Sequence, residues 1–287
     1  GHRPGGMRWH AVLAQRKAMD FQRLITTLQK TGHKDCVLHM HPDDENQLTI
    51  ALKAEPSRPA CSAEVWCALQ TDQWFDEYEC KSMSGDHIHV DLTIESLAQC
   101  MKAADKADSV AMKLARKPMP CISIEIKALS VIVEHTVPVD VWTRTRVEND
   151  PLAEPMVDSP DRLVWLPQLK KLYELCDRLA KIDQTVHIGA DWATSELSFR
   201  VETDTTSFTA KYKVKTNAAG DEDAEVDDDE QSEVSVDIRM LAKILNCYQV
   251  NCKHAVMGIM DEVILMQITA GQKEDLKVTY YIPTLIT

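Results

Sequence analysis

Apolar residues in this chain follow a helical period in two separate stretches, and the two stretches match each other. In residues 18–30 (AMDFQRLITTLQK) they recur at i, i+3, i+4 and i+7, which places them on one face of a helix. Residues 168–182 repeat this stripe without a gap, so each half of the chain is predicted to contain a helix of the same kind. The matched positions, at a constant offset of 151, are Phe21, Leu24, Ile25 and Leu28 in the first stretch and Leu172, Leu175, Cys176 and Leu179 in the second.

A second pattern, a short strand that runs into an amphipathic helix, also occurs twice. Residues 235–245 (SVDIRMLAKIL) have it, and residues 90–101 (VDLTIESLAQCM) form an earlier copy. About twenty residues beyond each copy lies another apolar strand, at 110–114 and at 255–259. Because two pairs of elements recur in the same order, the chain is predicted to form two similar domains.

The stretches between these helices are short apolar runs divided by polar or proline-bearing turns, which is typical of antiparallel strands. In the first half the predicted strands are residues 8–14, 36–41, 47–53, 63–70, 74–80, 87–92, 110–115, 121–129 and 132–141, with a second helix at 94–107. In the second half they are residues 163–166, 185–192, 196–203, 207–213, 234–237, 255–259, 263–269 and 276–282, with a second helix at 238–248. The predicted fold class is α+β, in which each of two similar domains packs two helices on antiparallel sheets.

The apolar pattern fails between the two halves. Residues 143–160 (TRTRVENDPLAEPMVDSP) are polar and contain three prolines, which indicates an interdomain connector. We therefore expect a first domain at 7–142 and a second at 161–287. Residues 1–6 (GHRPGG) precede Met7 and are expected to be an expression remnant. Within the second domain, residues 216–233 are expected to form a disordered acidic loop.

Composition narrows the class of protein. With 287 residues, of which 44% are hydrophobic, the chain is long enough for two ordinary cores. No run approaches the length of a membrane span, and the N-terminus lacks the apolar core of a signal peptide, so we expect a soluble intracellular protein. The nine cysteines are odd in number and irregularly spaced. They are expected to be buried thiols in a reducing cell rather than a disulfide framework.

The net charge of −13 at first argues against nucleic acid, but its distribution changes the picture. Nine acidic residues lie in 221–233 alone (DEDAEVDDDEQSE), whereas the four predicted helices carry ten basic residues against five acidic ones. Helical spacing turns most of these bases away from the apolar stripes. They are either solvated surface charges with a few i,i+4 ion pairs, or a set of phosphate contacts that would bind DNA backbone without reading sequence.

Enzyme motifs are missing from the sequence. There is no GxxxxGK[ST], GxGxxG or GxSxG, and nine glycines are fewer than average, so no catalytic residue and no cofactor are expected. His39 with His41, and His87 with His89, are i,i+2 pairs that each share one strand face. Cys247, Cys252 and His254 form a loose C-x4-C-x-H without a second ligand pair. The simpler interpretation is that these histidines and cysteines have structural or surface roles. Residues 43–45 (DDE) are expected to form a turn. No metal site is expected, and a metal-dependent hydrolase is a remote alternative.

The repeated unit, the basic helices, the proline-bearing connector and the tyrosine-rich final strand together resemble the ring-shaped DNA sliding clamps typified by PCNA. Five short motifs also lie in order along the chain: Met7–Ala11 (MRWHA), Val65–Leu69 (VWCAL), Trp74–Tyr78 (WFDEY), Val236–Leu241 (VDIRML) and Tyr280–Leu285 (YYIPTL). These motifs resemble more closely the Hus-one type of subunit of the nine-one-one checkpoint clamp. The long acidic loop and the altered connector depart from the pattern, so no partner-binding residue is carried over to 142–160.

The resemblance implies the PCNA-like DNA-clamp fold and a non-catalytic nuclear subunit of a heterotrimeric ring. Its partners would be a Rad-nine-like and a Rad-one-like subunit, a clamp loader, double-stranded DNA bound without sequence specificity, and repair and signalling proteins, with no membrane. The DNA-facing residues would be Arg23, Lys30, Lys102, Lys106, Lys171, Arg178, Lys181, Arg239 and Lys243. The subunit edges would be two strands with the interface residues Val110, Met112, Leu114, Phe208, Ala210 and Tyr212. A homotrimeric replication clamp is the alternative with the same fold.

Overall fold

The computed structural model describes residues 7–57, 61–82, 85, 87–218, 231–271 and 273–285. The chain forms two compact units. Unit 1 comprises the described parts of residues 1–52, 66–154 and 275–277, and unit 2 those of residues 53–65, 155–274 and 278–287. The main boundary, between Glu154 and Pro155, lies within the stretch predicted to be the connector.

Unit 1 is built on antiparallel strands in two sheets. One sheet has the order β5-β1-β7-β8-β9, and in the other β10, β6, β2, β3 and β4 follow one another. The first contains β1 (Arg8–Leu13), β5 (Phe75–Lys81), β7 (Ser109–Arg116), β8 (Pro120–Ala128) and β9 (Val131–Pro138). The second contains β2 (Asp35–Met40), β3 (Gln47–Leu52), β4 (Glu64–Gln70), β6 (Ile88–Thr93) and β10 (Asp140–Val141).

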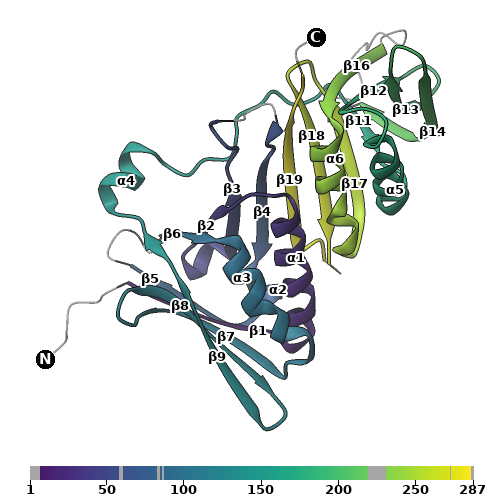
Figure 1. The fold of residues 1–287 in the computed structure, drawn as a ribbon. Helices are drawn as coiled ribbons and strands as arrows, with labels where there is room; N and C mark the ends of the chain where they lie inside the picture. Colours follow the sequence, from purple (N-terminus) through teal and green to yellow (C-terminus); the bar gives the residue numbers. More distant parts are fainter. Residues whose placement is uncertain are drawn as a thin grey trace, which may run out of the picture. The chain divides into compact units, whose positions relative to one another are not determined.

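Two helices of unit 1 lie side by side (Figure 1). Helix α1 (Ala18–Lys30) follows a 3₁₀ turn, η1 (Gln15–Lys17), and α3 (Ile94–Met101) continues into the 3₁₀ segment η4 (Lys102–Lys106). The predicted apolar stripe of α1 is the face that it buries. Shorter turns are η2 (Asp43–Glu45) and α2 (Thr71–Trp74), and the latter takes the first residue of the strand predicted at 74–80.

Unit 2 repeats this plan. One sheet has the order β14-β13-β12-β16, and in the other β19, β18, β17, β11 and β15 follow one another. The first contains β12 (Thr185–Asp191), β13 (Glu196–Glu202), β14 (Ser207–Lys213) and β16 (Gln231–Asp237). The second contains β11 (Arg162–Trp165), β15 (Lys215–Ala218), β17 (Cys252–Ile259), β18 (Val263–Ala270) and β19 (Leu276–Pro283).

The helices of unit 2 are α5 (Leu169–Leu179) and α6 (Ile238–Leu245), which contact each other, and η5 (Asn246–Gln249) follows α6. Asp237 caps α6, because its Oδ1 accepts a hydrogen bond of 2.8 Å from the backbone N–H of Met240. The strand therefore passes directly into the helix, as the repeated sequence pattern predicts. None of the described helices combines the length and the apolar character that crossing a membrane would need.

Two segments differ from the sequence prediction. The connector contains a short helix, α4 (Arg144–Asn149), which the side chain of Thr143 caps. The predicted acidic loop at 216–233 overlaps the strands β15 and β16, so its bounds were too wide. The rest of that predicted loop, residues 219–230, lies outside the described part of the chain.

Residues at the start of the connector are fixed to β6 by a single carboxylate. Trp142 Nε1 donates a hydrogen bond of 2.8 Å to Asp91 Oδ1, and Arg146 Nη1 contacts Asp91 Oδ2 at 2.5 Å. The guanidinium of Arg146 also lies 3.9 Å from the centre of the Trp142 ring, which adds a cation–π contact. These contacts hold α4 against the sheet of unit 1.

The cysteines are free thiols, and most are buried. Burial raises the pKa of Cys36 and that of Cys176 to about 12. Both are therefore protonated at neutral pH and act as small apolar side chains, which agrees with the sequence prediction.

Candidate nucleic-acid interface

The helices of unit 1 present basic side chains on the face opposite their apolar stripes. On α1, the buried residues include Phe21 and Leu28, while Lys30 is exposed and Arg23 is half-exposed. Lys102 and Lys106 are exposed on η4, which contacts α1. Four of the predicted DNA-facing residues thus lie on adjoining helical segments.

The helices of unit 2 carry four of the other five. Lys171 and Arg178 are exposed on α5, and Arg239 and Lys243 are exposed on α6, which has no acidic residue. Lys181 lies beyond α5, because this helix ends at Leu179 rather than at residue 182 as predicted.

Most of these cations have no counter-ion among the residues that the structure describes. Arg23 lies 3.9 Å from Asp20, and Lys181 lies 3.3 Å from Asp177. Across the described parts of the chain, the remaining seven form no ion pair with another residue. Unpaired lysines and arginines on a helix surface are the groups that bind phosphate oxygens, and they do so without reading bases.

Of the two strands predicted to be subunit edges, β14 lies at the edge of a sheet, and β7 does not. Among the described strands β14 pairs with β13 alone, so it ends its sheet, and Phe208 on it is 43% exposed. Strand β7 is paired on both sides, with β1 and β8, and Val110 and Met112 on it are buried. Since its backbone groups are already bonded, β7 has no free edge for another chain, and Leu114 on the same strand cannot serve as an edge residue either. The positions on β14 that were predicted with Phe208 are Ala210 and Tyr212.

The edge that the sequence analysis missed is β9. It ends the five-stranded sheet, and of the strands that the structure describes it pairs with β8 alone. Val131 is 57% and Ile132 63% exposed, and Val133 is also exposed. An open strand with exposed β-branched residues is suited to pairing with another chain. The apolar run at 131–133 was a signal for it, but the sequence alone does not show which strand of a sheet lies at the end.

The histidine pairs come together in space, which the sequence could not show. His39 and His89 are directly opposite each other on β2 and β6, and their rings stack at 3.8 Å between centres. His39, His41 and His87 are the one group of potential metal ligands found among the residues that the structure describes. The Cys247, Cys252 and His254 set is not such a group. The turn predicted at 43–45 is the 3₁₀ turn η2.

Two units, each with a pair of helices against antiparallel sheets, define a clamp of the PCNA-like class. Proliferating Cellular Nuclear Antigen from Entamoeba histolytica has the same fold, with a TM-score of 0.74 at 11% identity over 97% of this chain and 99% of that one. The PCNA2–PCNA3 complex from Sulfolobus tokodaii matches with a TM-score of 0.69 at 12% identity, over 96% of this chain and 98% of that one.

The sequence comparison narrows this class to one family. The Hus1-like protein family matches residues 7–286, so the chain belongs to it. Checkpoint protein HUS1 from Homo sapiens is 28% identical over 275 residues, which cover 92% of this chain and 94% of that protein. The predicted fold class and the resemblance on which it rested are both confirmed.

Proposed function

We propose that this chain is a non-catalytic subunit of a heterotrimeric checkpoint clamp that encircles duplex DNA. The observation that carries the proposal is a set of seven basic side chains on the helical segments of both units that form no ion pair with any described residue, in a chain whose net charge is −13. Backbone contacts of this kind hold DNA without sequence preference and permit sliding. Membership of the Hus1-like family supports this proposal of a checkpoint clamp.

The ring closes through sheet edges in this proposal. The open strands β9 in unit 1 and β14 in unit 2 each pair with an edge strand of a neighbouring subunit. The neighbours are two clamp-like chains of the Rad-nine and Rad-one type, and a separate loader places the ring on DNA in the nucleus. The closed ring then serves as a platform for signalling and repair proteins.

The edge strands provide the test of this assembly. Changing Val131 and Ile132 on β9 to lysine is expected to reduce the yield of the three-chain complex at least about tenfold, because charged side chains would replace the apolar contacts at the joint. The same prediction applies to Phe208→Lys on β14. Co-expression of the three chains, followed by native mass spectrometry, measures the complex.

A matched control uses Met156, a connector residue that is 98% exposed and lies on no strand. Met156→Lys is expected to leave assembly unchanged. If the edge variants assemble as well as this control, the proposed joints are wrong. If the isolated chain forms a stable homotrimer, the alternative of a PCNA-like replication clamp replaces the heterotrimer.

A further inference from the structure

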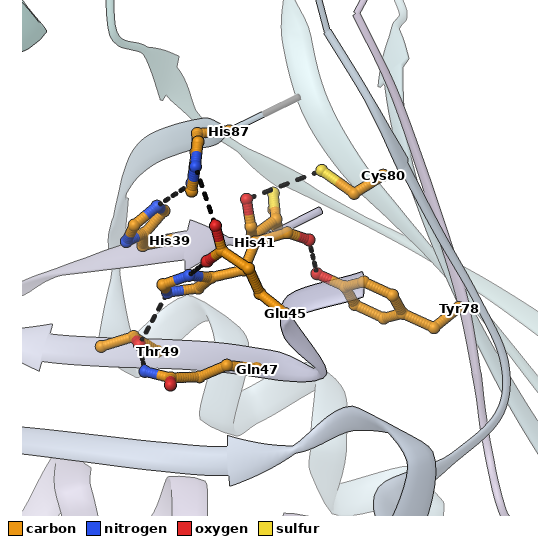
Figure 2. Close-up of polar contacts among 9 residues, drawn as sticks. His39, His41, Glu45, Gln47, Thr49, Tyr78, Cys80 and His87 are labelled. Carbon is orange, nitrogen blue, oxygen red and sulfur yellow. Dashed lines mark hydrogen bonds and ion pairs between the residues drawn. The ribbon is translucent and has the colours of Figure 1, made fainter. Parts of the chain in front are cut away.

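A cluster of imidazoles occupies one face of the β2–β6 ladder in unit 1. His39 lies on β2 and His41 directly follows this strand, while His87 directly precedes β6 and His89 lies on β6, opposite His39. Figure 2 shows His39, His41 and His87 turned toward one another, with Glu45 from the turn η2 beside them. Side chains from two strands and one turn therefore converge on a small volume.

The distances within the cluster are those of a ligand set. His39 Nε2 and His87 Nδ1 are 3.1 Å apart, and the ligand atoms of His39, His41 and His87 all lie within 4.8 Å of one another. Two nitrogens bound to one tetrahedral zinc ion, each at about 2.0–2.1 Å, lie roughly 3.3 Å apart. An ion can therefore enter among these three rings.

Glu45 supplies the negative charge that imidazole ligands lack. Its Oε2 lies 2.6 Å from His41 Nδ1, and its Oε1 lies 3.3 Å from His87 Nε2. Zinc accepts histidine nitrogen and carboxylate oxygen in the same site. Because His87 faces His39 with Nδ1 and Glu45 with Nε2, a rotation of the His87 ring or of the carboxylate completes a four-coordinate set with the three histidines.

Hydrogen-bonding residues outside the proposed ligand set orient the ring of His41. Its Nε2 lies 3.1 Å from Thr49 Oγ1, and that oxygen accepts a hydrogen bond of 2.9 Å from Gln47 Nε2. When His41 Nε2–H donates to Thr49, the lone pair of Nδ1 points to the side of Glu45. A ligand histidine commonly has such a hydrogen-bond partner on its second nitrogen, which fixes its tautomer.

The side chains of the cluster differ in their exposure to solvent. The His41 side chain is only 12% exposed, whereas Glu45 is 44% exposed, so an ion would enter from the side of the carboxylate.

We propose that His39, His41, His87 and Glu45 bind one zinc-class divalent ion, which joins β2, β6 and the turn η2. The site belongs to unit 1 alone and does not depend on the proposed clamp function. Four protein side chains fill the tetrahedral coordination of the ion and leave no position for water or a substrate. The ion therefore has a structural role. His89 stacks on His39 and on Trp142, and it links the site to the start of the connector.

The test is zinc binding by the full chain after treatment with a chelator. Titration with zinc against a chromophoric competitor is expected to give one tight site per chain, and zinc is expected to raise the melting temperature. His39→Asn and His87→Asn should each weaken binding at least about 100-fold, because a lost ligand costs more than a lost outer-shell contact. His10→Asn, a lone histidine on β1 of the same unit, should bind as the unchanged protein does.

Cobalt(II) gives a readout that needs no variant. A tetrahedral site in the unchanged protein is expected to produce the intense visible absorption of four-coordinate cobalt, which zinc then displaces. The absence of a tight zinc site in the unchanged protein would overturn the proposal and leave a hydrogen-bonded imidazole cluster only. Binding that persists in the His39→Asn/His87→Asn double variant would place the ion elsewhere and overturn it as well.

Discussion

Replacing Asp275 with alanine is expected to lower the free energy of unfolding by about 3–5 kcal/mol, because it leaves the ammonium of Lys17 buried without a partner. Lys17 is 7% and Asp275 3% exposed, and Lys17 Nζ lies 3.0 and 2.9 Å from the two carboxylate oxygens. Trp74 Nε1 also donates a hydrogen bond of 2.9 Å to Asp275 Oδ1. The carboxylate therefore joins the residue before β19 to the turns that flank α1 and β5.

Chemical denaturation followed by tryptophan fluorescence measures this effect. Glu196→Ala is the matched control, because Glu196 pairs with Lys211 and Lys213 on the protein surface, where such contacts contribute at most about 1 kcal/mol. A loss for Asp275→Ala no larger than that of this control would contradict the assigned role. The double change Lys17→Met/Asp275→Leu should recover part of the loss, since it removes both charges together.

Changing Lys102, Lys106, Arg239 and Lys243 together to alanine is expected to weaken DNA binding by the assembled ring by at least about 100-fold at physiological salt. Each phosphate contact contributes close to one unit to the slope of log K against log salt, so the slope should fall by about three to four. These four residues form no ion pair within the described part of the chain, so their removal leaves no acid unpaired. Fluorescence anisotropy with a labelled duplex at several salt concentrations gives both quantities.

The control for this variant must remove the same charge from elsewhere. Lys113, Lys127, Lys215 and Lys277 are exposed and lie on strands rather than helices. Their combined change to alanine should reduce affinity only slightly, through net charge. An equal effect of the two sets would mean that overall charge, and not the helix faces, governs binding.

The sequence patterns predicted the features of the structure that depend on residues close together in the chain. The 3.6-residue stripe gave α1 its bounds at Ala18 and Lys30, and the apolar runs located most strands to within one or two residues. The strands β16 and β17 begin three residues before their predicted starts, the run predicted as one strand at 132–141 is divided into β9 and β10, and β15 was not predicted as a strand. Helical spacing also placed the exposed bases correctly, because an outward direction follows from the position of the apolar stripe.

Features that depend on strand order and register could not be predicted in the same way. The apolar pattern of β7 identifies it as a strand, but only its pairing with both β1 and β8 shows that it is internal. The same strand order shows that β9 is an edge of this sheet. The approach of His39 to His87 requires the register of β2 against β6. Lys17 and Asp275 are 258 residues apart, and nothing local to either position indicates the other.

Retention on closed circular DNA tests most directly the claim that the ring encircles DNA. The three-chain ring is loaded on nicked circular DNA by its loader with ATP, and it is then passed through a sizing column at a salt concentration that abolishes simple binding. The account predicts that the ring stays with circular DNA and is lost when the DNA is cut once, because a ring slides off an end. Equal loss from circular and linear DNA, or equal retention on both, would contradict encirclement.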